Sequence, residues 1–279
     1  MASYWEIQRV PTTGDLEDDM ATYVSQPSVS GKVPAVIVVQ EVFGVNSHIQ
    51  SVADRLAAAG YFAVAPALFH REGTTEGIRG TNPFYTYAGI AGVPDDPPER
   101  ERRTRAIQNW RDENIILDLN TTIEWLKRHP RVIGDKIGIV GFCAGGRITY
   151  MAAAACPGLS CAVDFYGGNK LVALGGGPTT PFARTAQVRC PVMGNYGALD
   201  QNPTVDQVQQ LEAELKRHNK VYDFKMYPGA GHGFLCDERP SYHEASAKDA
   251  WERTLGWFQK YMGAAPATAA PARRTRARR

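Results

Sequence analysis

Residues 136–146 read KIGIVGFCAGG, and this stretch decides the fold of the chain. An apolar run at residues 136–140 leads into a glycine-framed turn, and the small apolar sequence RITYMAAAA follows at residues 147–155. That order predicts a strand, a tight turn and a helix, with Cys143 at the tip of the turn. The pattern has the form of a G-x-S-x-G nucleophile elbow in which cysteine takes the place of serine. Such a turn lifts the Cys143 sulfur to the edge of the sheet, where a substrate can reach it.

The main alternative for Cys143 is a buried cysteine without a chemical role, because cysteine often packs as a small hydrophobe. The glycine frame and the strand–helix context favour a nucleophile instead. In that case the backbone N–H of Ala144, at the start of the following helix, is expected to donate to the oxyanion of the reaction.

A base and an orienting acid are expected after Cys143, because α/β-hydrolases use the chain order nucleophile, acid, histidine. Asp200 follows the apolar run CPVMGNY at residues 190–196, and His232 stands in a glycine-rich loop after YDFKMY at residues 222–227. Both residues therefore fall at the carboxyl ends of predicted strands, the edge where open α/β sheets bind their ligands. For Asp200, a turn or cap role is the alternative.

A fourth candidate follows the β-branched run VPAVIVVQ at residues 33–40, which is typical of a central strand. The loop after this strand donates the second oxyanion N–H in this fold, and we expect it from Val42. Glu41 then lies close to the nucleophile, where a carboxylate opposes thiolate formation. It could hold the thiol neutral, or take its proton when the substrate displaces it. A glutamate that points to solvent is the alternative.

Strands alternate with helices along the chain, which predicts a mostly parallel central sheet with helices on both faces. Apolar stripes indicate helices at residues 114–128 and at about 243–262. Two extended segments, residues 4–9 and 20–27, flank a turn at residues 14–15 and predict an antiparallel edge. With 43% hydrophobic residues, residues 1–263 are expected to form a single domain of the α/β-hydrolase fold.

Four blocks in this order together resemble the dienelactone hydrolase family. They are QEVFGVN at residues 40–46, GFCAGG at 141–146, GALD at 197–200 and GHGF at 231–234. The resemblance covers roughly residues 15–262. It implies a hydrolase of small esters or lactones that works through a cysteine acyl-enzyme, without a metal or an organic cofactor.

The resemblance also implies roles for individual residues. The implied catalytic triad consists of Cys143, His232 and Asp200. Glu41 is implied to switch the cysteine on when substrate arrives. An arginine, aligned at Arg103 ahead of Trp110, is implied to receive a substrate carboxylate, although residues 100–105 could equally be a solvated helix face. Trp110 and Phe234 are expected to contact the substrate.

Two departures bear on the substrate. Enzymes that open dienelactones carry a second arginine four residues after the catalytic histidine, and here that position is Cys236. The predicted carboxylate clamp is therefore missing, or rebuilt from Arg71, Arg102, Arg103 or Arg239. The second departure is the irregular segment at residues 71–99, rich in aromatic residues, glycine and proline, which we expect to be a partial lid over the substrate pocket.

The C-terminal residues 264–279 contain five arginines and no acid, so they outweigh the net charge of +2 and leave a mildly acidic body. This tail is expected to be disordered and to bind anions weakly at most, without a dedicated nucleic-acid site. The five cysteines form no C-x-x-C pair, which argues against a zinc site. We find no leader and no membrane-spanning run, so we expect a cytoplasmic monomer or homodimer.

Two other functions remain open on the sequence alone. A thioesterase or acyltransferase could use the same fold, because an acyl-enzyme can pass its acyl group to acceptors other than water. A non-catalytic, hydrolase-like binding protein is the other possibility.

Overall fold

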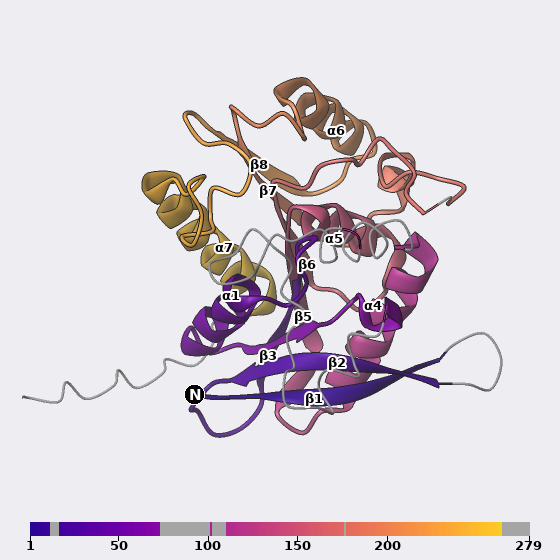
Figure 1. Cartoon of the computed structure of the whole chain (residues 1–279), viewed down its shortest axis with the longest axis vertical. Helices are drawn as coiled ribbons and strands as arrows, with labels where there is room; N and C mark the ends of the chain where they lie inside the picture. The colour runs from indigo at the N-terminus through magenta and orange to yellow at the C-terminus, as the bar shows by residue number, and fades with distance from the viewer. Residues whose placement is uncertain (12–16, 73–100, 102–109, 176, 264–279) are drawn as a thin grey trace, which may run out of the picture.

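One eight-stranded sheet with helices on both faces forms the body of the protein (Figure 1). This computed structural model describes residues 1–11, 17–72, 101, 110–175 and 177–263. The strand order is β1-β2-β4-β3-β5-β6-β7-β8. The predicted turn at residues 14–15, the tail at 264–279 and nearly all of the expected lid lie outside the described residues. Among the residues described, no helix is both long and apolar enough to cross a membrane.

The sheet is parallel except at one edge. Its strands are β1 (Ala2–Pro11), β2 (Glu17–Gln26), β3 (Val33–Val39), β4 (Phe62–Pro66), β5 (Val132–Phe142), β6 (Cys161–Phe165), β7 (Val192–Gly197) and β8 (Tyr222–Tyr227). Strand β1 pairs with β2 and β2 with β4 in antiparallel fashion, and every later pair is parallel. The predicted antiparallel N-terminal edge and the parallel centre are therefore confirmed.

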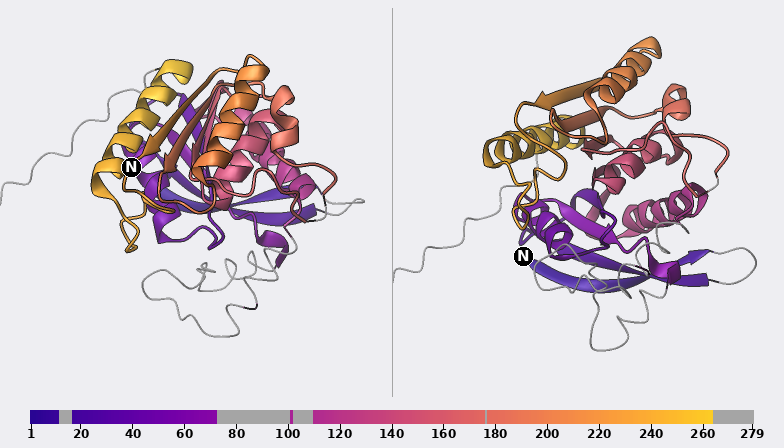
Figure 2. Two further views of the ribbon diagram at one scale, coloured as in Figure 1. Left: turned by 90° about the horizontal axis from the view of Figure 1, so that it is seen from above. Right: turned by 45° about the horizontal axis from the view of Figure 1, so that its top comes forward.

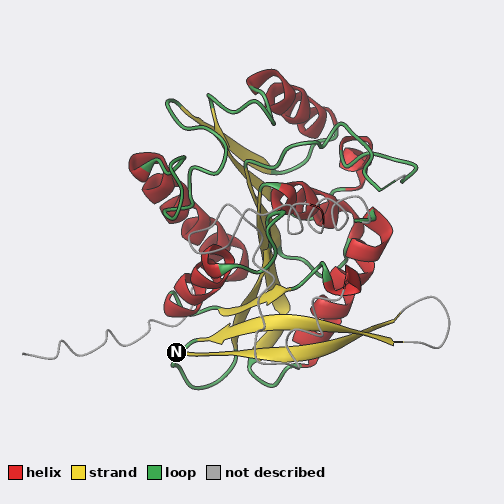
Figure 3. Cartoon of the chain, in the orientation of Figure 1, coloured by secondary structure: helices red, strands yellow, loops and turns green. Residues whose placement is uncertain are grey.

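Helices cover the sheet in two groups, which Figures 1 and 2 show from different sides and Figure 3 colours by element type. One face carries α1 (Ser47–Ala58) and α7 (Glu244–Met262). The other carries α4 (Asp112–Arg128), α5 (Ala144–Ala155) and α6 (Val205–Arg217). Two short 3-10 helices, η1 (His70–Glu72) and η2 (Phe182–Gln187), lie in connections.

The central strand β3 shows why its sequence is apolar throughout. Successive side chains of a strand point to opposite faces. Ala35 and Ile37 accordingly join the core under α4 and α5, whereas Val36 and Val38 join the core under α1 and α7. All seven residues of the strand are buried. A continuous hydrophobic run is therefore the expected signature of a strand that is covered on both faces.

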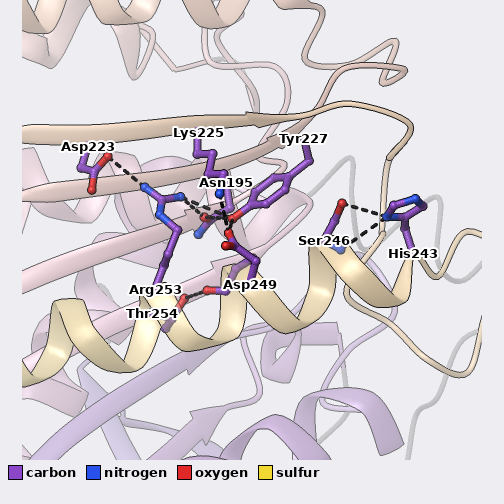
Figure 4. A network of polar contacts seen from close by, with 10 residues as sticks. Asn195, Asp223, Lys225, Tyr227, His243, Ser246, Asp249, Arg253 and Thr254 are labelled. Atoms are coloured by element: carbon purple, nitrogen blue, oxygen red, sulfur yellow. Dashed lines mark hydrogen bonds and ion pairs between the residues drawn. The ribbon is translucent and has the colours of Figure 1, made fainter.

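Polar contacts fasten α7 to the edge of the sheet (Figure 4). Arg253 donates to Asn195 Oδ1 at 2.7 Å and to Asp223 Oδ1 at 2.9 Å. Tyr227 donates to Asp249 Oδ2 at 2.7 Å, and Lys225 lies 2.8 Å from the same oxygen. These bonds lower the pKa of Asp249, with the Lys225 hydrogen bond the largest cause. The helix that follows the His232 loop is thereby held against β7 and β8.

Candidate active site

The turn after β5 has the strained backbone of a nucleophile elbow. Cys143 adopts φ 56° and ψ −119°, and few residues other than glycine occur at positive φ. A Cβ on Gly141 would lie 2.1 Å from the Gly145 carbonyl oxygen, and one on Gly145 would lie 2.4 Å from the Val39 oxygen. Both positions therefore require glycine. The Cys143 N–H donates to Phe165 O at 3.0 Å, which ties the turn to β6.

Asp200 and His232 form the second part of the site. His232 Nδ1 lies 2.8 Å from Asp200 Oδ2, although the two residues are 32 positions apart in the chain. Asp200 also accepts a hydrogen bond from the Asn202 N–H at 2.8 Å, which orients its nearly buried carboxylate. This geometry is that of an acid that orients a base, and a simple turn role for Asp200 would not require it.

The His232 imidazole is in contact with the thiol as well. Burial lowers its pKa, but hydrogen bonds with Asp200 and Cys143 and the charges of both groups more than offset burial, so that the pKa is raised to about 10. The His232 imidazole thus has a raised affinity for a proton. It can therefore balance a thiolate at Cys143 and later deliver its proton to a leaving group.

A cavity of about 320 Å³ opens onto these three residues. Its described lining consists of Val42, Cys143, Ala144, Arg147, Gly168, Asn169, Leu174, Asp200, Gln201, Asn202 and His232. The cavity therefore contains the triad candidates together with both residues that were expected to supply oxyanion N–H groups.

Glu41 is fully buried, which excludes the alternative of a glutamate pointing to solvent. Arg239 donates to both of its carboxylate oxygens, to Oε1 at 3.1 Å and also to Oε2. The Arg239 guanidinium lies 4.6 Å from the centre of the Phe43 ring. Burial lowers the pKa of Arg239, but the charge of Glu41 outweighs this effect and raises it. Glu41, in the loop after β3, is therefore bound in a buried ion pair with Arg239, and its carboxylate is not free.

The residues expected to bind substrate lie outside the described lining of the cavity. Arg103 and Arg102 lie outside the described residues. Trp110 is buried against Phe69, with the ring centres 4.8 Å apart, and Phe234 is fully buried. Neither aromatic ring belongs to the described cavity lining. In the part of the chain that the structure describes, both pack among core residues.

The other positions considered for the carboxylate clamp are also engaged. Arg71 donates to both carboxylate oxygens of Asp118 at 2.7 Å. Cys236 is fully buried, with a pKa raised to about 11, chiefly by burial. Arg239, three residues later, is the arginine of this loop that reaches the Glu41 carboxylate.

Sequence reasoning missed Arg147 as part of the cavity. Its guanidinium forms a bidentate pair with Asp112, at 2.7 and 3.0 Å, and also donates to the backbone oxygens of Asn169 and Val172. Arg147 thereby joins α4, α5 and the loop after β6. One signal was present in the sequence, because Arg147 stands four residues after Cys143 and so lies one helical turn further along the same face.

Comparison with known proteins decides the family. The model of the dienelactone hydrolase family matches residues 20–262. The chain belongs to this family. A relative from Salmonella typhimurium strain LT2, provisionally named carboxymethylenebutenolidase, is 38% identical over 262 residues, which cover 92% of this chain and 87% of that protein. An Escherichia coli K12 relative with the same provisional name is 36% identical and covers 91% of this chain and 86% of its own length.

A crystal structure agrees with the family assignment. It is that of a provisionally named dienelactone hydrolase from Klebsiella pneumoniae, with 35% identity and a TM-score of 0.75 over 94% of this chain and all of that one. As a family member, the chain is a hydrolase of the lactone and ester class. The resemblance first seen in four short sequence blocks is therefore confirmed along most of the chain.

Proposed function

We propose that the protein hydrolyses small carboxylic esters or lactones through an acyl-enzyme on Cys143. The observation that carries this proposal is the contact series Cys143–His232–Asp200, which faces one cavity. A thiol beside an imidazole whose second nitrogen is bonded to a buried carboxylate is the arrangement that nucleophilic acyl transfer requires.

The reaction follows from these positions. The Cys143 thiolate attacks the carbonyl carbon, a C–S bond forms, and the carbonyl electron pair moves onto oxygen. The N–H groups of Val42 and Ala144 stabilise that oxyanion. When the pair returns, the C–O bond to the leaving group breaks and His232 supplies its proton to the leaving oxygen. In the second half, His232 takes a proton from water, hydroxide attacks the thioester, and Cys143 leaves as the thiolate.

Glu41 would control this cycle through its partner. While Arg239 donates to both carboxylate oxygens, the charge of Glu41 is balanced and its carboxylate is not available to accept a proton. A bound substrate that draws Arg239 away would free a buried carboxylate with no counter-charge, whose affinity for a proton is high. Glu41 would then take the thiol proton, which is the switching role that the family resemblance implies.

We expect neutral substrates to be turned over better than carboxylated ones. The position of the second clamp arginine holds the buried Cys236, and the Arg147 charge beside the cavity is neutralised by Asp112. Loss of a charge-assisted contact weakens carboxylate binding by about 1.5–3 kcal/mol. A panel of neutral and carboxylated lactones of equal size tests this expectation, and strong preference for the carboxylated members would show that Arg239 or another arginine serves as the clamp.

The function itself is tested with p-nitrophenyl acetate. Cys143→Ala should abolish measurable turnover, whereas the matched variant Cys190→Ala, which removes a buried thiol outside the cavity lining, should retain it. Full activity in Cys143→Ala would overturn the proposal. Adding an alcohol or thiol acceptor to the wild type distinguishes hydrolysis from acyl transfer, since an acyltransferase would yield the acylated acceptor as its main product.

We also propose a cytoplasmic location. A catalytic thiol requires a reducing environment, and all five cysteines are free.

A further inference from the structure

Tyr166 is an unexplained polar group beneath the catalytic residues. It follows β6 directly and is fully buried. Its hydroxyl has no hydrogen-bond partner among the residues that the structure describes. Buried polar atoms are nearly always paired, so an unpaired buried hydroxyl calls for a physical reason. An acceptor that exists only during the reaction is one such reason.

The contacts around Tyr166 keep its backbone in an unfavourable conformation. Tyr166 has φ 41°, a left-handed conformation that is unfavourable for a bulky side chain. Its N–H donates to Asn195 O at 2.9 Å. The next residue, Gly167, donates to the buried Asp164 carboxylate at 2.9 Å, and Lys170 lies 2.7 Å from the same carboxylate. These contacts fix the loop around Tyr166, and they compensate for its unfavourable backbone conformation.

The Tyr166 ring lies against the residues of the reaction. Its edge meets the His232 imidazole, with the ring centres 5.1 Å apart and an interplanar angle of 61°. It also packs on Phe142, the residue before the nucleophile, with the ring centres 6.3 Å apart. A phenol in this place is held between the base and the elbow.

Electrostatics keep this phenol protonated. Burial raises the pKa of Tyr166 well above its usual range, and the charges of Glu41, Cys236 and Cys143 raise it further, while Arg239 lowers it. The hydroxyl therefore remains a hydrogen-bond donor throughout the working pH range, and Glu41 is the charge that acts on it most strongly.

We propose that Tyr166 is a further catalytic residue, whose hydroxyl donates a hydrogen bond to the Cys143 thiolate; this inference rests on the proposed function. A neutral thiol is a weak acceptor, which accounts for a hydroxyl that has no partner at rest. A thiolate is a strong acceptor, so the bond forms when Cys143 loses its proton and when it leaves the acyl group. Glu41 is the competing acceptor, but Arg239 already occupies both of its oxygens.

Other charged groups surround Cys143 and must be kept unchanged in any test. They are the His232–Asp200 pair from the loops after β8 and β7, the Glu41–Arg239 pair beside β3, the Arg147–Asp112 pair between α5 and α4, and His48 on α1, whose pKa is lowered chiefly by burial. Tyr166→Phe removes only a hydroxyl and alters none of these groups. A change in thiol titration in this variant therefore reports the hydroxyl itself.

The test measures the rate of iodoacetamide alkylation at Cys143 against pH. Tyr166→Phe should move the midpoint of this profile upward by at least about one pH unit, which slows alkylation below the midpoint roughly tenfold or more. The acidic limb of kcat/KM for p-nitrophenyl acetate should move in the same direction. Tyr150→Phe is the matched control, because its buried hydroxyl bonds Thr185 at 2.7 Å and is not part of the site; its profile should coincide with that of the wild type.

Two further measurements keep the test decisive. A ring-fluorinated tyrosine at position 166 is a stronger donor and should move the midpoint downward, and this arm decides the question if Tyr166→Phe does not fold. Superimposable profiles in the wild type and the folded variants would overturn the inference, and so would lower activity with an unchanged pH profile. If Cys143→Ala is inactive but Tyr166→Phe leaves the midpoint unchanged, only this inference fails; an active Cys143→Ala removes the proposed function itself.

Discussion

Two buried carboxylates at the same edge of the sheet are bonded to different cations. Asp200 follows β7 and bonds His232, and Glu41 follows β3 and bonds Arg239. Both cations come from the single segment between β8 and α7. The side chains of Asp200 and Glu41 are 3% and 0% exposed, so burial does not distinguish the two sites. The two sites differ in the partner of the carboxylate, which is His232 in one and Arg239 in the other. The partner determines whether the pair can transfer a proton.

Histidine can pass its proton to a leaving group and take one from water during the reaction, whereas arginine remains charged. The Asp200–His232 pair is therefore suited to carry a proton between thiol, leaving group and water. The Glu41–Arg239 pair is suited to balance the charge of a carboxylate and to hold it in place until its partner is withdrawn. One chain segment thus supplies both a proton carrier and a fixed counter-charge.

The largest effect is expected from removing the charge that orients the proton carrier. Asp200→Asn keeps the shape but removes the negative charge and turns one of the two acceptor oxygens into an NH2 donor, so the imidazole loses its orientation and its stabilised charged form. Turnover of p-nitrophenyl acetate should fall by roughly three to four orders of magnitude. Steady-state kinetics, with circular dichroism as a check on folding, measure this loss.

Glu41→Gln is the matched variant for the second pair. If the comparison is correct, it lowers turnover less than Asp200→Asn and changes the rate at which iodoacetamide alkylates Cys143, because only its role as a switch is lost. Equal losses of turnover in the two variants would show that both carboxylates belong to one proton-transfer unit. A Glu41→Gln variant that matches the wild type in both assays would leave Glu41 a structural residue.

Stability should show the next largest difference. Arg239→Ala leaves the fully buried Glu41 carboxylate without its partner, and breaking a buried pair in this way costs about 3–5 kcal/mol. The free energy of unfolding from urea titration should fall by this amount, and Glu41→Gln added to Arg239→Ala should recover part of it.

A surface pair provides the control. Arg217 pairs with Glu214 on α6, but its side chain is 66% exposed, so Arg217→Ala should leave the free energy of unfolding nearly unchanged. Similar costs for Arg239→Ala and Arg217→Ala would mean that water reaches Glu41, and the idea of a counter-charge held without solvent would be wrong.

The same comparison shows what the sequence could predict. The strand ends that carry Cys143, Asp200 and Glu41 follow apolar runs with a clear pattern, and His232 stands in a glycine frame after another such run. Their placement at one edge of the sheet follows from parallel topology, so it could be predicted. Element ends were less certain: β5 begins at Val132 and α4 at Asp112, a few residues earlier than their apolar patterns indicate.

The partner of Glu41 could not be predicted, because the path of an irregular loop follows no period. Counting four residues after His232 leads to Cys236, which the loop turns into the core, while Arg239 returns to the site. Trp110 and Phe234 were expected to contact the substrate on the family resemblance, but a loop sequence does not reveal which aromatic side chains are buried. Tyr166 carried no signal, since its role depends on a strained backbone and an unpaired hydroxyl.

The smallest expected effect is on the pH dependence of the free energy of unfolding, to which His232 contributes and the permanently charged Arg239 does not. The pKa of His232 in the folded protein is raised to about 10, because bonds with Asp200 and Cys143 more than offset burial, while an unfolded histidine titrates near pH ~6.5. A raised pKa stabilises the fold fully below the unfolded value, and the contribution is lost as pH rises through the folded value. Since the His232 side chain is 37% exposed, we expect about 1 kcal/mol.

The measurement is the free energy of unfolding of the wild type minus that of His232→Gln, followed across this pH window. The difference should be largest at and below the unfolded pKa and should shrink as pH rises toward about 10. Because other titrating groups are common to both proteins, their contributions largely cancel. In an Asp200→Asn background the slope should become smaller, since the main hydrogen bond that raises the pKa is weakened. A difference that stays constant over the window would show that His232 gains no proton affinity on folding, and the distinction between a proton carrier and a fixed counter-charge would then rest on kinetics alone.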